Sequence, residues 1–159
     1  MERPAVFTFE PIGIVQSAYT DTAQIPKGLG AEHSAEGVLE VEPRFEPGLL
    51  DIEGFSHLYV LWVFDRAKGS DLLAMPPSDN RPHGVFATRS PQRPNPIGLT
   101  VVRLLRREGT RLFVRGVDML DGTPVLDIKP YLSSVPPGEL RRGWLAEADL
   151  RASRNRVGR

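Results

Sequence analysis

Residues 57–64 read HLYVLWVF, the most apolar run in the chain. Aromatic and β-branched residues favour strands, and an unbroken run of them is typical of a strand in the middle of a sheet. The run is far too short to cross a membrane as a helix. It therefore predicts a central, buried strand around which the fold is built.

Further short strands are predicted on both sides of this run. The 15 glycines and 15 prolines of the 159-residue chain punctuate alternating or β-branched segments, a pattern that favours short strands and tight turns over long helices. Glu108 and Gly109 predict a hairpin turn. The predicted strands are 12–16, 37–41, 84–87, 98–106, 110–116 and 123–128.

Two helical segments are expected outside the strands. Residues 43–54 predict a short helical turn with Pro47 at its first position. Residues 138–150 predict a C-terminal helix, because Leu140, Trp144 and Leu145 fall roughly on one side of it.

Composition sets the class of protein. The chain is 40% hydrophobic and 25% charged, as in ordinary globular domains, and has no cysteine, which excludes disulfides, thiolate zinc sites and cysteine nucleophiles. Its net charge is zero, so any nucleic-acid contact must come from a local patch. Residues 1–11 lack the apolar region of a signal peptide. We expect one domain over residues 1–150, a basic and flexible tail over 151–159, and a cytoplasmic location without a membrane span.

Common cofactor motifs are absent. Gly28-Leu29-Gly30 resembles the start of a dinucleotide-binding turn, but His33 occupies the third glycine position and Pro26-Lys27, rather than a strand, precedes it. The three histidines are too scattered to predict a metal site.

The segment GVFATRSPQRPNPIGL, residues 84–99, carries three prolines among polar side chains. Proline fixes φ, so the loop is predicted to be stiff and to present Arg89, Arg93 and Asn95 with little entropy left to lose. This suits a preorganised binding loop. A rigid connector and a polyproline ligand for another domain are the alternatives.

The segment DMLDGTPVLDIKPY, residues 118–131, begins with a turn at Asp121-Gly122 and continues as a strand. Asp127, Lys129 and Tyr131 fall on one face of that strand. They could accept a proton and hold an anion, or form a solvated strand face.

Arginines gather on the predicted hairpin. Arg111, Phe113 and Arg115 share a strand face, a combination that can hold phosphates and stack a splayed base. A solvated face is the alternative.

Several of these stretches together resemble the TrmO family, also called YaeB-like. The stretches are IGIVQS (12–17), AEGVLEV (35–41), FSHLYVLWVF (55–64), GVFATRSPQRPNPIGLTVVRL (84–104) and DGTPVLDIKPYL (121–132). The resemblance implies a small antiparallel β-barrel with short helical segments and a C-terminal helix. It also implies a homodimer that uses S-adenosylmethionine (SAM), without a metal, to methylate N6 of the threonylcarbamoyl-modified adenosine next to the tRNA anticodon.

For this reaction, the strand face with Asp127, Lys129 and Tyr131 offers the candidate catalytic residues, and the resemblance implies the cofactor contacts. Asp127 is the candidate proton acceptor, with Lys129 and Tyr131 orienting the substrate; a structural role for Asp127 is the alternative. Family members carry His-Gln where this chain has Asp65-Arg66, a change that would keep backbone but not side-chain contacts. The implied cofactor-binding residues are Leu29, Gly30, Ala31, Asp65, Arg66, Arg89, Leu99, Gly122, Thr123, Pro124 and Val125.

Two other functions remain open. The first is a SAM-dependent enzyme of the same fold with another acceptor. The second is a non-catalytic RNA- or nucleotide-binding barrel.

Overall fold

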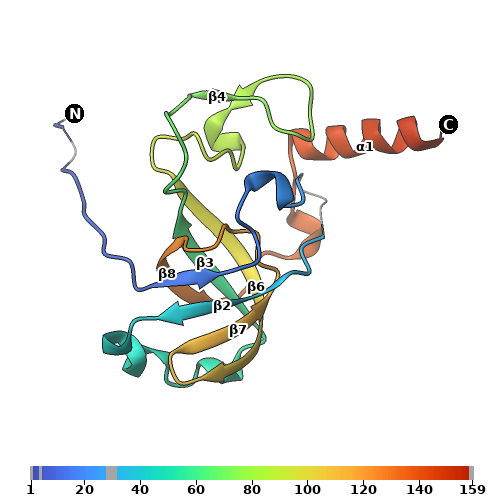
Figure 1. Cartoon of the computed structure of the whole chain (residues 1–159). Coiled ribbons are helices and arrows are strands. Elements are labelled where there is room, and N and C mark those ends of the chain that lie inside the picture. The colour runs from blue at the N-terminus through green and yellow to red at the C-terminus, as the bar shows by residue number, and fades with distance from the viewer. Residues whose placement is uncertain (1, 4, 28–31, 158–159) are drawn as a thin grey trace. The chain divides into compact units, whose positions relative to one another are not determined.

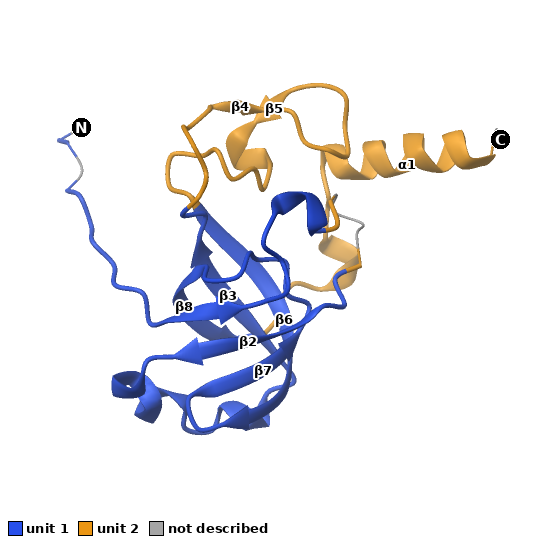
Figure 2. Cartoon of the chain, viewed as in Figure 1, with its two compact units in different colours: residues 1–25, 33–65, 97–131 blue, residues 26–32, 66–96, 132–159 orange. Residues whose placement is uncertain are grey.

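The computed structural model describes residues 2–3, 5–27 and 32–157 (Figure 1) and divides into two units. One unit comprises Met1–Ile25, His33–Asp65 and Ile97–Tyr131, and the other comprises Pro26–Glu32, Arg66–Pro96 and Leu132–Arg159 (Figure 2).

The first unit is a closed antiparallel barrel, as predicted. Its strands follow the order β1-β2-β7-β6-β3-β8. Their bounds are Gly13–Gln16 (β1), Glu36–Val41 (β2), His57–Val63 (β3), Ile97–Glu108 (β6), Arg111–Arg115 (β7) and Pro124–Pro130 (β8).

Strand β3 confirms the central strand predicted from HLYVLWVF, but its two faces differ. Leu58, Val60 and Trp62 are buried, whereas the residues between them are only partly buried. The prediction of a strand buried throughout was therefore wrong. A small barrel has one filled interior, so every second side chain of a strand points outward.

Gly98 of β6 leaves room for the indole ring of Trp62, the largest side chain of the core. Gly98 pairs in register with Trp62, and a Cβ on Gly98 would lie 2.2 Å from the indole ring. The indole Nε1 donates to Thr100 Oγ1 at 3.0 Å, and that hydroxyl donates to Asp118 Oδ1 at 2.6 Å. The buried indole is thus packed on one strand and hydrogen-bonded to the same strand.

Two bulges interrupt the ladders. The β6–β7 register shifts between Leu104 and Arg106, which leaves Leu105 as an extra residue. The β3–β8 register shifts between Leu61 and Trp62, which leaves Leu126 as an extra residue opposite them. A bulge bends its strand and increases the local twist.

Short 3-10 helices lie between the barrel strands. They span Thr22–Gln24 (η1), Pro43–Leu49 (η2) and Ile52–Gly54 (η3). The helical turn predicted over 43–54 is confirmed, but Pro43 rather than Pro47 occupies its first turn. Both prolines are compatible with a helix start, and Pro43 is separated from the end of β2 by only one residue, Glu42.

The second unit holds a two-stranded sheet, two 3-10 helices and one α-helix. Their bounds are Leu73–Ala74 (β4), His83–Gly84 (β5), Val85–Ala87 (η4), Pro137–Glu139 (η5) and Trp144–Val157 (α1). The strand predicted over 84–87 is wrong beyond Gly84, because Thr88 N donates to Val85 O and closes a helical turn.

The C-terminal helix exists, but its predicted bounds of 138–150 are wrong. Gly143, at φ +56°, precedes the start at Trp144. The basic residues beyond Leu150 continue the helix to Val157, since alanine and arginine are good helix formers. The single domain over 1–150 and the flexibility of 151–159 stay predictions.

A buried carboxylate connects α1 to the rest of the second unit. The side chain of Asp79 is 2% exposed and accepts from His83 Nε2 at 2.7 Å and from Arg151 at 2.6 Å. The hydrogen bond from His83 is the largest cause that lowers the pKa of Asp79. Trp144 stacks on His83 at 4.2 Å and donates to Ala87 O at 2.8 Å.

The described residues contain no helix that is long and apolar enough to cross a membrane.

We expect Gly98→Ala to lower the free energy of unfolding by about 1–3 kcal/mol, because the new methyl group must displace the Trp62 indole. Urea unfolding measures the change. Gly54→Ala is the matched control, since a Cβ there meets nothing within 4 Å. Equal stability of the two variants would contradict the importance of this contact.

Candidate cofactor and substrate site

The turn that precedes β8 carries the predicted cofactor residues Gly122 and Thr123, and β8 itself begins with two more, Pro124 and Val125. Gly122 has φ +81°, a conformation that favours glycine. Thr123 is 2% exposed, and its Oγ1 donates to Leu120 O at 2.6 Å. Gly122 N donates to Val15 O and Asp121 N to Tyr19 O, both at 2.8 Å. The turn is therefore fixed to the end of β1.

Side chains and backbone differ in this turn in what they can offer a ligand. The side chains of Thr123 and Val125 are buried, and Val125 belongs to the core cluster. Pro124 is partly buried. A cofactor contact at Thr123 or Val125 would thus have to come from the backbone, not from the side chain.

Strand β8 carries the predicted catalytic residues Asp127 and Lys129, and Tyr131 follows its last residue, Pro130. Lys129 Nζ lies 2.8 Å from Asp127 Oδ2, and the two side chains are 62% and 46% exposed. The Tyr131 ring packs against Tyr59 with 5.1 Å between centroids. The structure therefore brings Asp127 and Lys129 together on β8, and the ring of Tyr131 just beyond β8 packs on Tyr59 of the neighbouring strand β3.

Leu99 lies on the same outer face of the barrel. It pairs in register with Leu61 on β3, and Leu61 pairs on its other side with Asp127. Two strand spacings separate Leu99 from Asp127, about 10 Å. A predicted cofactor residue and the predicted proton acceptor thus share one row of the barrel surface.

The second unit holds Arg89 and Arg66, while Asp65 ends a barrel segment. Arg89 is exposed, and its side chain makes no hydrogen bond or ion pair with any residue in the described part of the chain. Asp65 and Arg66 are exposed. Leu29, Gly30 and Ala31 lie outside the described residues.

The loop around Arg89 is braced by Arg93, whose side chain was predicted to be presented by the loop but instead bonds to it. Arg93 donates to Thr88 O at 2.9 Å and to Ser90 O at 3.3 Å. Its guanidinium therefore satisfies the loop's own carbonyls, whereas that of Arg89 stays available. The sequence signal was the pair of arginines four residues apart in a proline-rich loop.

Tyr59 was also not predicted as a site residue. Its side chain points outward from β3, where it pairs in register with Lys129 of β8. Its ring packs against the ring of Tyr131. The period of two along HLYVLWVF was the signal that placed it on the barrel exterior.

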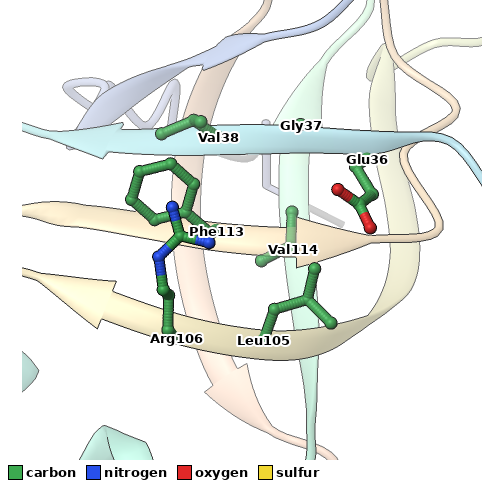
Figure 3. Close-up of a pocket in the computed structure, with 7 residues that line it drawn as sticks. All are labelled: Glu36, Gly37, Val38, Leu105, Arg106, Phe113 and Val114. Carbon is green, nitrogen blue, oxygen red and sulfur yellow. The ribbon is translucent and has the colours of Figure 1, made fainter.

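A pocket of about 230 Å³ opens elsewhere on the barrel, between β2, β7 and β6 (Figure 3). None of its lining residues belongs to the predicted cofactor or catalytic set.

We expect Gly122→Ala to weaken SAM binding measured by calorimetry, because an L-residue at φ +81° strains the turn by about 1–2 kcal/mol. Gly69→Ala is the control: Gly69 has φ +78°, and a Cβ there also meets nothing within 4 Å. Both variants should lose similar stability. Equal SAM affinity of the two would remove the turn from the cofactor site.

Comparison with known proteins places the chain in a family. The family model of the tRNA-methyltransferase O N-terminal domain matches residues 14–136. A probable S-adenosyl-L-methionine-binding protein of Pyrococcus abyssi is 48% identical over 146 residues, which are 91% of this chain and 79% of that protein.

The mouse tRNA (adenine(37)-N6)-methyltransferase is 40% identical over 131 residues, 78% of this chain but only 30% of that protein. The crystal structure of TrmO from Pseudomonas aeruginosa superposes with a TM-score of 0.69 at 38% identity, covering 87% of this chain and 62% of that one. The chain thus spans less than two thirds of the crystallised protein. The family model nevertheless matches all of the barrel strands apart from Gly13, the first residue of β1, and the chain belongs to the TrmO family.

Proposed function

We propose that this chain binds SAM and transfers its methyl group to N6 of an adenosine in tRNA. Family membership over residues 14–136 is the observation that carries the proposal. The row that joins Leu99 to Asp127 on the barrel exterior supports it, because it places an acceptor carboxylate near a proposed cofactor residue.

Taken each within its own unit, the predicted residues carry groups that a sulfonium nucleotide can use. The Arg89 guanidinium can bind a carboxylate through two parallel hydrogen bonds. The exposed Leu99 side chain and the backbone of the Gly122 turn can contact an adenine ring and its polar edge. When bound, SAM would supply a methyl group already attached to a good leaving group, so the protein mainly has to position the reactants, and the transfer requires no metal.

Asp127 is our proposed proton acceptor. The adenosine amino nitrogen must lose a proton as it is methylated, and a carboxylate within hydrogen-bond reach can take it. The exposed ion pair with Lys129 stabilises the fold by less than about 1 kcal/mol. Asp127 Oδ1 also accepts from Ile128 N at 2.9 Å, so a structural role for this carboxylate is the alternative. Lys129 and Tyr131 would orient the substrate.

The finer substrate proposal is the threonylcarbamoyl-modified adenosine next to the anticodon. We further propose that the chain acts as a homodimer in the cytoplasm, where tRNA is available. A SAM-dependent enzyme with another acceptor and a non-catalytic RNA- or nucleotide-binding barrel are the competing functions.

We expect Arg89→Ala to weaken SAM binding by about ten- to a hundredfold, as loss of a charge-assisted pair should. Isothermal titration calorimetry measures the dissociation constant. Arg141→Ala is the matched control, since Arg141 is also exposed in the second unit and pairs with no described residue. Unchanged affinity in Arg89→Ala would remove this arginine from the site.

We expect the wild-type chain to methylate tRNA that carries the threonylcarbamoyl group and to leave tRNA that lacks it unmodified. Incubation with SAM, followed by nucleoside mass spectrometry, measures the product. Methylation of both tRNAs would overturn the finer substrate. Binding of SAM without methylation of either would favour another acceptor, and failure to bind SAM would favour a non-catalytic barrel.

A further inference from the structure

An outer patch of the barrel has features of a ligand site that the proposed function does not use. We call it the Arg–Phe patch, comprising Glu36, Arg103, Arg106, Phe113 and Arg115. It contains the pocket between β2, β7 and β6 (Figure 3). All of its residues belong to the barrel unit.

The bulge at Leu105 shapes this pocket. Arg106 pairs in register with Phe113 after the bulge, and Leu105 lines the pocket beside it. The pocket volume, about 230 Å³, is sufficient for a nucleobase. A bulge next to a pocket is a common way to re-aim a side chain.

A planar cation covers the aromatic ring of the patch. The Arg106 guanidinium lies 3.7 Å from the Phe113 ring centroid, and Arg111 approaches the same ring at 5.4 Å. Figure 3 shows the Arg106 guanidinium in front of the ring. The Arg106 side chain is 57% exposed, so the outer side of the guanidinium is accessible. Guanidinium planes are platforms on which splayed RNA bases stack.

Two arginines of the patch face each other. Arg103 on β6 pairs in register with Arg115 on β7. Like charges directly opposite on neighbouring strands are unfavourable, and an anion between them would remove the cost. The Arg103 side chain pairs with no residue in the described part of the chain.

The carboxylates of the patch do not neutralise it firmly. Arg115 lies 3.1 Å from Glu36 and Arg106 lies 3.0 Å from Glu108, but all four side chains are 47–63% exposed. Ion pairs at such exposure are weak, so phosphate oxygens can replace them.

We propose that the Arg–Phe patch binds one unpaired nucleotide of the tRNA other than the methylated adenosine. Its base stacks on the Arg106–Phe113 pair, and its phosphate lies between Arg103 and Arg115. The inference rests on the proposed function for the identity of the RNA. RNA is favoured over an acidic protein segment because the patch combines a planar stacking surface with a pocket of base size beside paired arginines.

Equilibrium tRNA binding by the full chain tests the proposal. Arg106→Ala and, separately, Phe113→Leu should weaken the binding of threonylcarbamoyl-modified tRNA roughly 5- to 100-fold, the usual range for losing a stacked base. SAM affinity should stay unchanged in both. Arg103→Ala should remove one phosphate contact. The slope of log affinity against log salt concentration should therefore become shallower by about 1.

Arg44→Ala is the matched control, and it should bind tRNA like the wild type. Its guanidinium also lies over a phenylalanine, Phe45, at 4.4 Å, is also 57% exposed and also pairs with a glutamate two residues away. Equal losses in Arg44→Ala and Arg106→Ala, or no loss in Arg106→Ala, would overturn the patch. AMP serves as a second probe. If Arg106→Ala lost AMP binding but kept wild-type tRNA binding, the patch would serve a free nucleotide, and this result would also overturn the proposal.

The two proposals fail separately. If the wild-type chain bound tRNA more tightly than Arg106→Ala but transferred no methyl group, the proposed reaction would be refuted and the patch supported. Methylation that proceeds with an unchanged tRNA KM in Arg106→Ala would support the reaction and refute the patch.

Discussion

The contact between the Trp62 indole and Gly98 is the constraint on which the rest of the barrel depends. The indole occupies the space that a side chain on β6 would otherwise fill, and its N–H is satisfied by Thr100 on that same strand. Thr100 then donates to Asp118, at the start of the turn that leads to β8. One buried aromatic residue thus fixes β3 against β6 and links both to the segment that carries the proposed catalytic residues.

The core side chains of the barrel strands lie in its interior, whereas the predicted catalytic side chains of Asp127 and Lys129 lie on its exterior. The outward positions of β3, β6 and β8 form rows, and one row joins Leu99, Leu61 and Asp127. The turn at Gly122 belongs to the barrel unit and offers backbone groups, whereas the loop that Arg93 braces belongs to the second unit and carries the exposed Arg89. Strands supply precise spacing, while turns supply polar groups that a strand ladder would consume.

The sequence predicted the barrel strands well because their alternation and turn residues are local signals. The faces of Asp127 and Lys129, and of Arg111 and Arg115, followed from the same alternation. The helix over 144–157 was misplaced because its start depends on the backbone at Gly143, and the strand over 84–87 was misassigned because a hydrogen bond from Thr88 turns it into a helical turn. The position of Arg106 over Phe113 could not be predicted, since it depends on a bulge that only strand register reveals. The cofactor residues came from resemblance and the catalytic residues from the strand face that they share, and both sets remain proposals.

The bulge at Leu105 has a consequence for how the barrel can change over evolution. Outward residues of β6 have odd numbers up to Arg103 and even numbers from Arg106. Leu105 is therefore an extra residue that shifts the alternation of inward and outward side chains by one position. A strand without it would keep every other side chain on its present face and would pair with β7 without interruption. The extra leucine thus changes the surface at the pocket, which it lines, while the strands on both sides of it keep their pairing with β7.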